Sequence, residues 1–287
     1  MSWVWWALAS ALLIATADLV VKRYFADLPT VEVVTARFLG LLPASLVMLA
    51  IIDWPPLDGA FFTALGAALP AELAAMFLYV RAIQVSPLAL TIPYLAFTPL
   101  LAIGTDYLVN HDLPNWPGLL GVVLLVAGAY GLNLHQARLG PAEPLRALWR
   151  EPGSRMMLAT SAIYAYTVVL GRLALKHSSP LFMAAFYPLL IIVAVSAILL
   201  PLKRLSWSWL RRPWPALALA LCMSGMAICH YLALDQTQAS YMVAIKRLSP
   251  LFAVLYGGFL LGEVRLGQHL VATALMVGGA VVIALLG

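Results

Sequence analysis

Three charged side chains fall inside long apolar stretches of the sequence, where an unpaired charge is costly. Glu72 lies near the middle of one stretch, and Lys246 and Arg247 lie about a third of the way into another. A charge in the middle of a bilayer costs about 2.5–3.5 kcal/mol, so such residues usually face the protein interior and are functional. Lys246 is predicted to bind a substrate carboxylate and Glu72 an amine. In this reading Arg247 neutralises loops or headgroups. The alternative is a structural ion pair between Glu72 and Lys246.

Tyrosine and histidine side chains in these stretches add candidates for the same site. Glu72 and Tyr79 are seven residues apart, so they share one helix face. A phenol inside a membrane needs a hydrogen-bond partner that lipid cannot supply, so these rings should face protein or a wet cavity. The alternative is hydrogen bonding between packed helices. The predicted substrate-binding residues are Glu72, Tyr79, Tyr94, Tyr164, His230 and Lys246.

The composition indicates which elements must position these residues. The 287-residue chain is 63% hydrophobic, has 17 Lys or Arg and 12 Asp or Glu, and has a mean hydropathy of +0.95. This balance excludes soluble globular, disordered and nucleic-acid-binding proteins. We expect an all-α polytopic membrane protein. Its apolar stretches predict ten transmembrane helices, at residues 3–21, 31–52, 60–81, 87–108, 117–134, 155–175, 180–202, 213–234, 239–261 and 266–286.

A constant offset of 151 residues relates the two halves of the chain. It pairs Pro29 with Pro180, Pro99 with Pro250, and Gly128 with Gly279. Each half has an odd number of spans, so the halves must insert in opposite directions, as in many transporters. The sequence therefore predicts two inverted five-helix repeats, at residues 1–135 and 155–287, around a central cavity. Residues 136–154 are predicted to form the connecting loop.

Two prolines occupy equivalent positions in the fourth and ninth predicted spans. Pro99 and Pro250 each remove a backbone N–H donor from the interior of a helix. Matching helix breaks in two repeats are a sequence signature of a transporter's binding region. Both residues are predicted to be gating hinges, and ordinary packing kinks are the alternative.

Lysine and arginine are unevenly distributed between the two sides of the predicted bundle. One side carries Arg172 and Lys176 together with both termini, whereas the loops on the other side hold twelve basic residues. Basic loops face the cytoplasm in most membrane proteins, so both termini are predicted to lie outside, most simply in a bacterial inner membrane. The basic loop residues are Lys22, Arg23, Arg81, Arg138, Arg146, Arg150, Arg155, Lys203, Arg204, Arg211, Arg212 and Arg265.

Patterns typical of enzymes, cofactors and metal sites are missing from the sequence. The five histidines show no metal-ligand spacing, and no glycine-rich loop suited to a nucleotide is present. Ser224 and His230 are six residues apart, which places them on different faces of a helix. We therefore expect neither an enzyme nor a bound cofactor, metal or nucleic acid, and the sequence makes no prediction about the oligomeric state.

The last quarter of the chain resembles a known family of carriers. The segment from Ala239 through Leu248-Ser249-Pro250-Leu251-Phe252 to Leu261-Gly262-Glu263 is similar to the second half of EamA-type carriers of the drug/metabolite transporter superfamily. The first half, from Val85-Ser86-Pro87 through Thr98-Pro99-Leu100, is a weaker copy. There Asn110-His111-Asp112 stands where the family prefers Gly-Glu.

The resemblance implies ten helices in two inverted halves and export of a small molecule through a central cavity. Within the superfamily the chain looks most like YddG-like exporters of aromatic and other amino acids. We therefore expect a secondary exporter of amino acids or similar small amphipathic metabolites that works by alternating access. The alternatives are a channel-like or scramblase-like pore, or an exporter of drugs or other metabolites.

Overall fold

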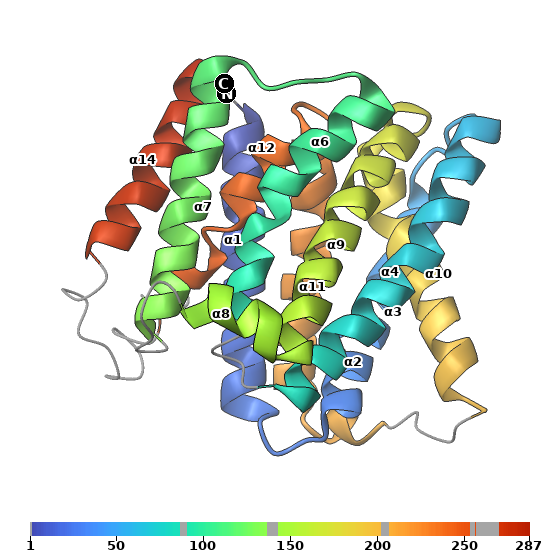
Figure 1. The fold of residues 1–287 in the computed structure, drawn as a ribbon. Helices are drawn as coiled ribbons and strands as arrows, with labels where there is room; N and C mark the ends of the chain where they lie inside the picture. Colours follow the sequence, from blue (N-terminus) through green and yellow to red (C-terminus); the bar gives the residue numbers. More distant parts are fainter. Residues whose placement is uncertain (1, 87–90, 137–142, 202–206, 253–255, 257–269) are drawn as a thin grey trace.

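The computed structural model describes residues 2–86, 91–136, 143–201, 207–252, 256 and 270–287, and this part of the chain contains helices and no strand (Figure 1). The elements are α1 (Ser2–Tyr24), α2 (Thr30–Leu39), α3 (Leu42–Ile51), α4 (Gly59–Val85), η1 (Ile92–Phe97), α6 (Thr98–Asn110), α7 (Trp116–Gln136), α8 (Glu143–Arg150), α9 (Pro152–Lys176), α10 (Pro180–Leu199), η2 (Ser208–Arg211), α11 (Pro213–Leu234), α12 (Ala239–Lys246) and α14 (Leu270–Leu286).

Six segments of the described chain are long and apolar enough to cross a membrane: Ser2–Tyr24, Val31–Ile51, Gly59–Tyr79, Pro152–Lys176, Pro180–Leu199 and Pro213–Leu234. Two shorter apolar helices, Trp116–Leu132 and Val271–Leu286, correspond to the fifth and tenth predicted spans. The fold is therefore that of an all-α polytopic membrane protein, and the total of ten spans stays a prediction.

The fourth and ninth predicted spans are broken rather than continuous. Residues 92–97 form the 3₁₀ helix η1, and Pro99 lies in the first turn of α6. In the ninth span α12 ends at Lys246, and a turn at Arg247 and Leu248 precedes the helical residues 249–252. The expectation that both prolines lie in the interior of a helix was wrong, because each lies in a first turn. Proline is best tolerated there, since its missing N–H would have no partner within the helix.

The connecting segment also differs from its prediction as a loop. Residues 143–150 form the short helix α8, and α9 begins at Pro152, inside the predicted loop. Proline at the start of a helix is favoured because its fixed φ already matches helical geometry. Residues 137–142 lie outside the described part of the chain.

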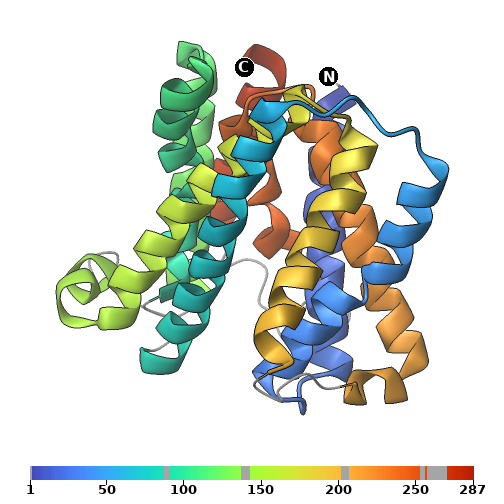
Figure 2. The same cartoon turned by 90° about the vertical axis from the view of Figure 1, so that its right-hand side faces the viewer.

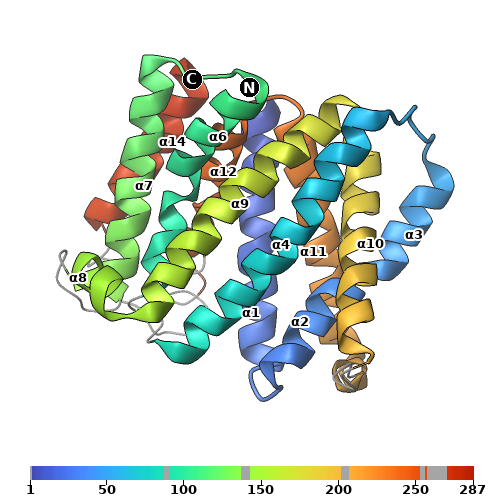
Figure 3. The same cartoon turned by 45° about the vertical axis from the view of Figure 1, so that its right-hand side comes forward.

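Helices from the two halves pack against each other in pairs. Helix α4 runs beside α9, α1 beside α11, and α7 beside α14 (Figure 3). Adding 151 residues to α1 gives the range 153–175 of α9, and subtracting 151 from α11 gives the range 62–83 of α4. The α1–α11 pair therefore corresponds to the α9–α4 pair. The repeat boundaries at 1–135 and 155–287 stay a prediction.

Close contact between α7 and α14 depends on glycines that the offset relates. A Cβ atom at Gly128 would lie 2.6 Å from Met276 Cγ, and one at Gly279 would lie 2.6 Å from the carbonyl oxygen of Gly121. Small residues let membrane helices approach through their backbones, where apolar burial alone gives little driving force.

The two ends of the bundle differ in their composition and helix spacing. Both termini lie at one end, here called the termini end, and α8 and the turn between α1 and α2 lie at the opposite end, here called the basic end (Figure 1). In Figure 2, α4 and α9 approach α1, α10 and α11 near the termini end and diverge from them toward the basic end.

Asp58 caps α4 at the termini end and provides a direct test of this part of the fold. Its carboxylate accepts the N–H of Phe61 at 3.0 Å and lies 2.8 Å from His177 Nδ1. The Phe61 N–H, and secondarily His177, hold the pKa of Asp58 below its usual range. We expect Asp58→Ala to lower the Tm in detergent by about 2–4 °C, and Asp58→Asn, which keeps a capping oxygen, to lower it less.

The pH dependence follows from the direction of this shift. A carboxyl group with a lowered pKa stabilises the fold above its unfolded pKa and loses that effect as the pH falls through the folded value. The Tm difference between wild type and Asp58→Ala should therefore persist from pH 8 to 5 and shrink below about pH 4. Equal Tm values at pH 7 would show that this cap does not stabilise the fold.

Candidate functional site

A cavity of about 380 Å³ lies between helices of both halves. The first half contributes Glu72 from α4 and Thr98 from α6, and the second half contributes side chains of α9, α10, α11 and α12. Much of the wall is apolar or aromatic and a few polar groups converge on it, which is the usual character of a small-molecule site. The remaining lining residues are Ile14, Phe38, Leu41, Tyr164, Thr167, Val168, Gly171, Tyr187, Pro188, Ile191, Met223, Met226, Ala227, His230, Tyr231, Leu234, Val243, Lys246, Arg247 and Ser249.

Lys246 enters the cavity from the C-terminal end of α12. Its ammonium lies 3.3 Å from Met226 Sδ and 3.2 Å from His230 Nδ1, both on α11. With a charged lysine as donor, His230 accepts through Nδ1, so the imidazole is neutral in this contact. A lysine at a helix C-terminus also interacts favourably with the helix dipole. Among the described residues, Met226 and His230 accept two of the three N–H donors of Lys246, and the third remains for another acceptor.

Glu72 of α4 lines the same cavity as this ammonium. It is placed beside Thr167 of α9, and it interacts electrostatically with Lys246. In the described part of the chain, no ion pair within 4.0 Å joins the two side chains. The structural pair that was the alternative prediction is therefore not formed in this conformation. The cavity holds a carboxylate and an ammonium that do not neutralise each other by direct contact.

Arg247 also lines the cavity, although the sequence assigned it to loops or headgroups. It follows α12 directly, at the break in the ninth span, and its Nη2 donates to Thr98 Oγ1 at 2.8 Å. Thr98 Oγ1 lies 2.9 Å from Ser161 Oγ, and its hydroxyl donates to the carbonyl of Leu95 at 2.7 Å. The guanidinium Nε is buried without a hydrogen-bond partner. This assignment was wrong because the helix ends at Lys246, which turns the next side chain inward.

The aromatic candidates divide between the cavity and a separate cluster. Tyr164 and His230 line the cavity, and so does Tyr187, whose hydroxyl is buried without a partner. Tyr94 is 2% exposed and packs with Ala82 and Met157, and Tyr79 packs against the same cluster. Tyr94 was predicted to bind substrate, but it belongs to a 3₁₀ helix with three residues per turn, which changes the face that its side chain occupies. Tyr79 is two turns from Glu72, about 10 Å along α4.

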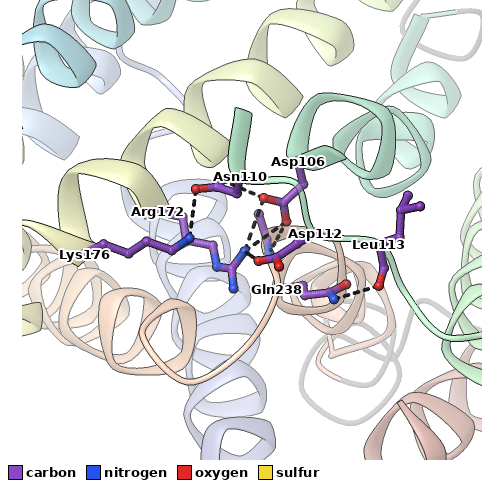
Figure 4. A network of polar contacts seen from close by, with 8 residues as sticks. Asp106, Asn110, Asp112, Leu113, Arg172, Lys176 and Gln238 are labelled. Atoms are coloured by element: carbon purple, nitrogen blue, oxygen red, sulfur yellow. Dashed lines mark hydrogen bonds and ion pairs between the residues drawn. The ribbon is translucent and has the colours of Figure 1, made fainter. Parts of the chain in front are cut away.

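Sequence reasoning missed a polar network at the termini end (Figure 4). Asp106 of α6 is 1% exposed, and Arg172 Nη1 of α9 lies 3.3 Å from its Oδ1 and 2.6 Å from Asp112 Oδ2. Asp106 Oδ2 also accepts the first N–H of α12, from Ala239, at 3.2 Å. In the sequence, Asp106 and Arg172 lie near the C-terminal ends of the fourth and sixth predicted spans. Their opposite charges at the same end of two spans were the sequence signal that could have indicated this contact.

The same network extends along α6 and α9. Asn110 Nδ2 donates to Asp106 Oδ1 at 2.7 Å, and Lys176 Nζ donates to Asn110 Oδ1 at 3.1 Å. Asp106 therefore joins the fourth span to the sixth and ninth spans. A carboxylate at the N-terminus of α12 is favourable because the first N–H groups of a helix lack partners within it.

Comparisons with known proteins place the chain in a family. The model of the EamA-like transporter family matches residues 1–134 and 152–285, which together cover most of the sequence. One solved crystal structure is similar over 99% of this chain and 98% of its own, with a TM-score of 0.74 and 19% sequence identity. That likeness shows the fold alone. No curated protein sequence matches this chain significantly.

Transport is the activity of this family, and the multi-pass helical fold with an internal cavity agrees with it. The protein therefore belongs to the EamA-like transporter family of the drug/metabolite transporter superfamily and is an integral membrane transporter of a small molecule.

Proposed function

We propose that the protein is a secondary transporter that exports amino acids, or similar small amphipathic metabolites, by alternating access. The observation that carries this proposal is the pair of opposite charges that line one cavity, Glu72 of α4 and Lys246 of α12, which form no direct ion pair in the described part of the chain. An amino acid has one carboxylate and one ammonium, so a single molecule pairs with both of these charges.

The energetic argument concerns desolvation of these charges. A buried charge without a partner costs several kcal/mol, and a substrate that supplies the missing partner recovers much of that cost. Lys246 has an N–H to donate to a carboxylate, and Glu72 accepts from an ammonium. Aromatic and apolar walls provided by Tyr164, Tyr187 and Tyr231 surround the remainder of the substrate.

Alternating access requires that one end of the bundle closes while the other opens. The Asp106–Arg172–Asp112 contacts join helices at the termini end, whereas α4 and α9 diverge from α1, α10 and α11 toward the basic end. If the basic loops face the cytoplasm, the contacts at the termini end close the outer side, and we propose that an exporter in this conformation takes up substrate from the inside. The helix breaks before Pro99 and Pro250 are the proposed hinges, and a bacterial inner membrane is the proposed location.

Counterflow in proteoliposomes tests the proposed function. Vesicles preloaded with unlabelled amino acids should take up the matching labelled amino acid faster than empty vesicles. The reason is that a carrier with substrate bound reorients across the membrane faster than an empty carrier. A pore gives no such trans-stimulation. Stimulation by drugs or other metabolites, with none by any amino acid, would overturn the proposed substrate class.

The charges of Glu72 and Lys246 generate a second prediction. We expect Glu72→Gln and Lys246→Met each to reduce amino-acid counterflow at least about tenfold, because each leaves one end of the zwitterion unpaired. The double exchange Glu72→Lys with Lys246→Glu should fold and yet not transport. Recovery of wild-type transport by this double variant would instead identify a structural pair, formed in another conformation.

The network at the termini end generates a third prediction. Arg172→Gln leaves two carboxylates facing each other, so we expect the termini end to open more often. Ala227→Cys lines the cavity and reports this opening through labelling by an impermeant maleimide, once Cys222 and Cys229 are replaced by alanine. Labelling from the termini side should rise at least about fivefold.

Two further variants make that experiment specific. Asp112→Asn removes the 2.6 Å contact to Arg172 and spares the buried Asp106, so it should raise labelling by a smaller factor. Arg37→Gln removes the Arg37–Asp18 pair between α1 and α2 and should leave labelling from the termini side unchanged. Equal labelling of wild type and Arg172→Gln would show that the network does not hold this end closed.

A further inference from the structure

The charges that line the cavity do not match a neutral amino acid. Among the described lining residues the formally charged side chains are Glu72, Lys246 and Arg247, two cations against one carboxylate. None of the three forms an ion pair in the described part of the chain. A substrate with one carboxylate and one ammonium satisfies Lys246 and Glu72, and it leaves the guanidinium uncompensated.

The two cations point to different walls. Lys246 lies against Met226 and His230 of α11, whereas Arg247 lies against Thr98 at the start of α6. Successive residues of a helix are about 100° apart around its axis, so adjacent positions at a helix end direct their side chains apart. One carboxylate bound at Lys246 is therefore poorly placed to neutralise Arg247 as well. The arrangement offers two separate anion positions.

The guanidinium of Arg247 donates fewer hydrogen bonds to the described residues than it has N–H donors. An arginine has five N–H donors, and the described residues accept one hydrogen bond from Arg247, at Thr98 Oγ1. Its Nε is buried without a partner. Within the described part of the chain no carboxylate lies within ion-pair distance of it. A carboxylate at the cavity side of this group would form charge-assisted hydrogen bonds, which are about twice as strong as neutral ones.

We propose that Arg247 selects a second carboxylate and that the preferred substrates are acidic amino acids, with two carboxylates and one ammonium. This proposal rests on the proposed function and makes it more specific. Lys246 binds one carboxylate, Glu72 the ammonium, and Arg247 the other carboxylate. All three cavity charges are then paired. Arg247 is a specificity-determining residue in this arrangement, and its contact with Thr98 fixes its direction.

Glutamate and glutamine provide the sharpest test, because they have the same shape and differ in one carboxylate. In counterflow by the wild-type protein, unlabelled L-glutamate should compete with labelled L-glutamate at least about tenfold better than L-glutamine does. Arg247→Gln should lose this preference and transport glutamine at least as well as glutamate. Arg247→Lys should keep part of the preference because it keeps the charge.

Arg155→Gln is the matched control, since Arg155 is an exposed arginine on α9 outside the cavity, and it should behave as wild type. Transport of glutamine or other neutral amino acids in preference to glutamate by the wild type would overturn the selection of a second carboxylate and leave the proposed function standing. So would an unchanged glutamate-to-glutamine ratio in a folded Arg247→Gln protein. Absence of counterflow with every amino acid would overturn the proposed function itself.

Discussion

The arrangement of the protein depends on how two adjacent cations are held at a helix end inside an apolar bundle. Lys246 ends α12 and Arg247 follows it, so both side chains leave the helix at its C-terminal end, where the helix dipole favours a cation. Sulfur, imidazole and hydroxyl groups contact these cations, and Glu72 interacts electrostatically with Lys246 without a direct ion pair in the described part of the chain. The positive charge that remains defines the cavity as a site for an anionic group.

Helix α12 also connects this cavity to the end of the bundle. Asp106 accepts the N–H of Ala239 at the start of α12, and the eight residues to Lys246 span about 12 Å. A short helix held at one end by a buried carboxylate moves as a unit. Separation of Asp106 from α12 would therefore displace Lys246 relative to Glu72. This link gives a physical route by which occupancy of the cavity and closure of the termini end affect each other.

Much of the fold could be predicted because apolar length determines it. The long apolar stretches form helices close to the predicted bounds, and Glu72, Tyr164, His230 and Lys246 do line one cavity. The positions of Pro99 and Pro250 relative to the helix breaks were not predicted correctly, because the apolar pattern of the sequence continues through these breaks. Tyr94 was misplaced for the same reason, since a 3₁₀ turn changes which face a residue occupies. The Asp106–Arg172 contact joins residues 66 positions apart and requires knowledge of which helices are neighbours.

The most direct test of the account is a structure determined with a transported amino acid bound. The account predicts the ligand in the cavity between the two halves, with a carboxylate within hydrogen-bond distance of Lys246 Nζ and the ammonium at Glu72. A bound substrate that contacts neither Glu72 nor Lys246, or one that occupies a different part of the bundle while these two residues pair with each other, would contradict it.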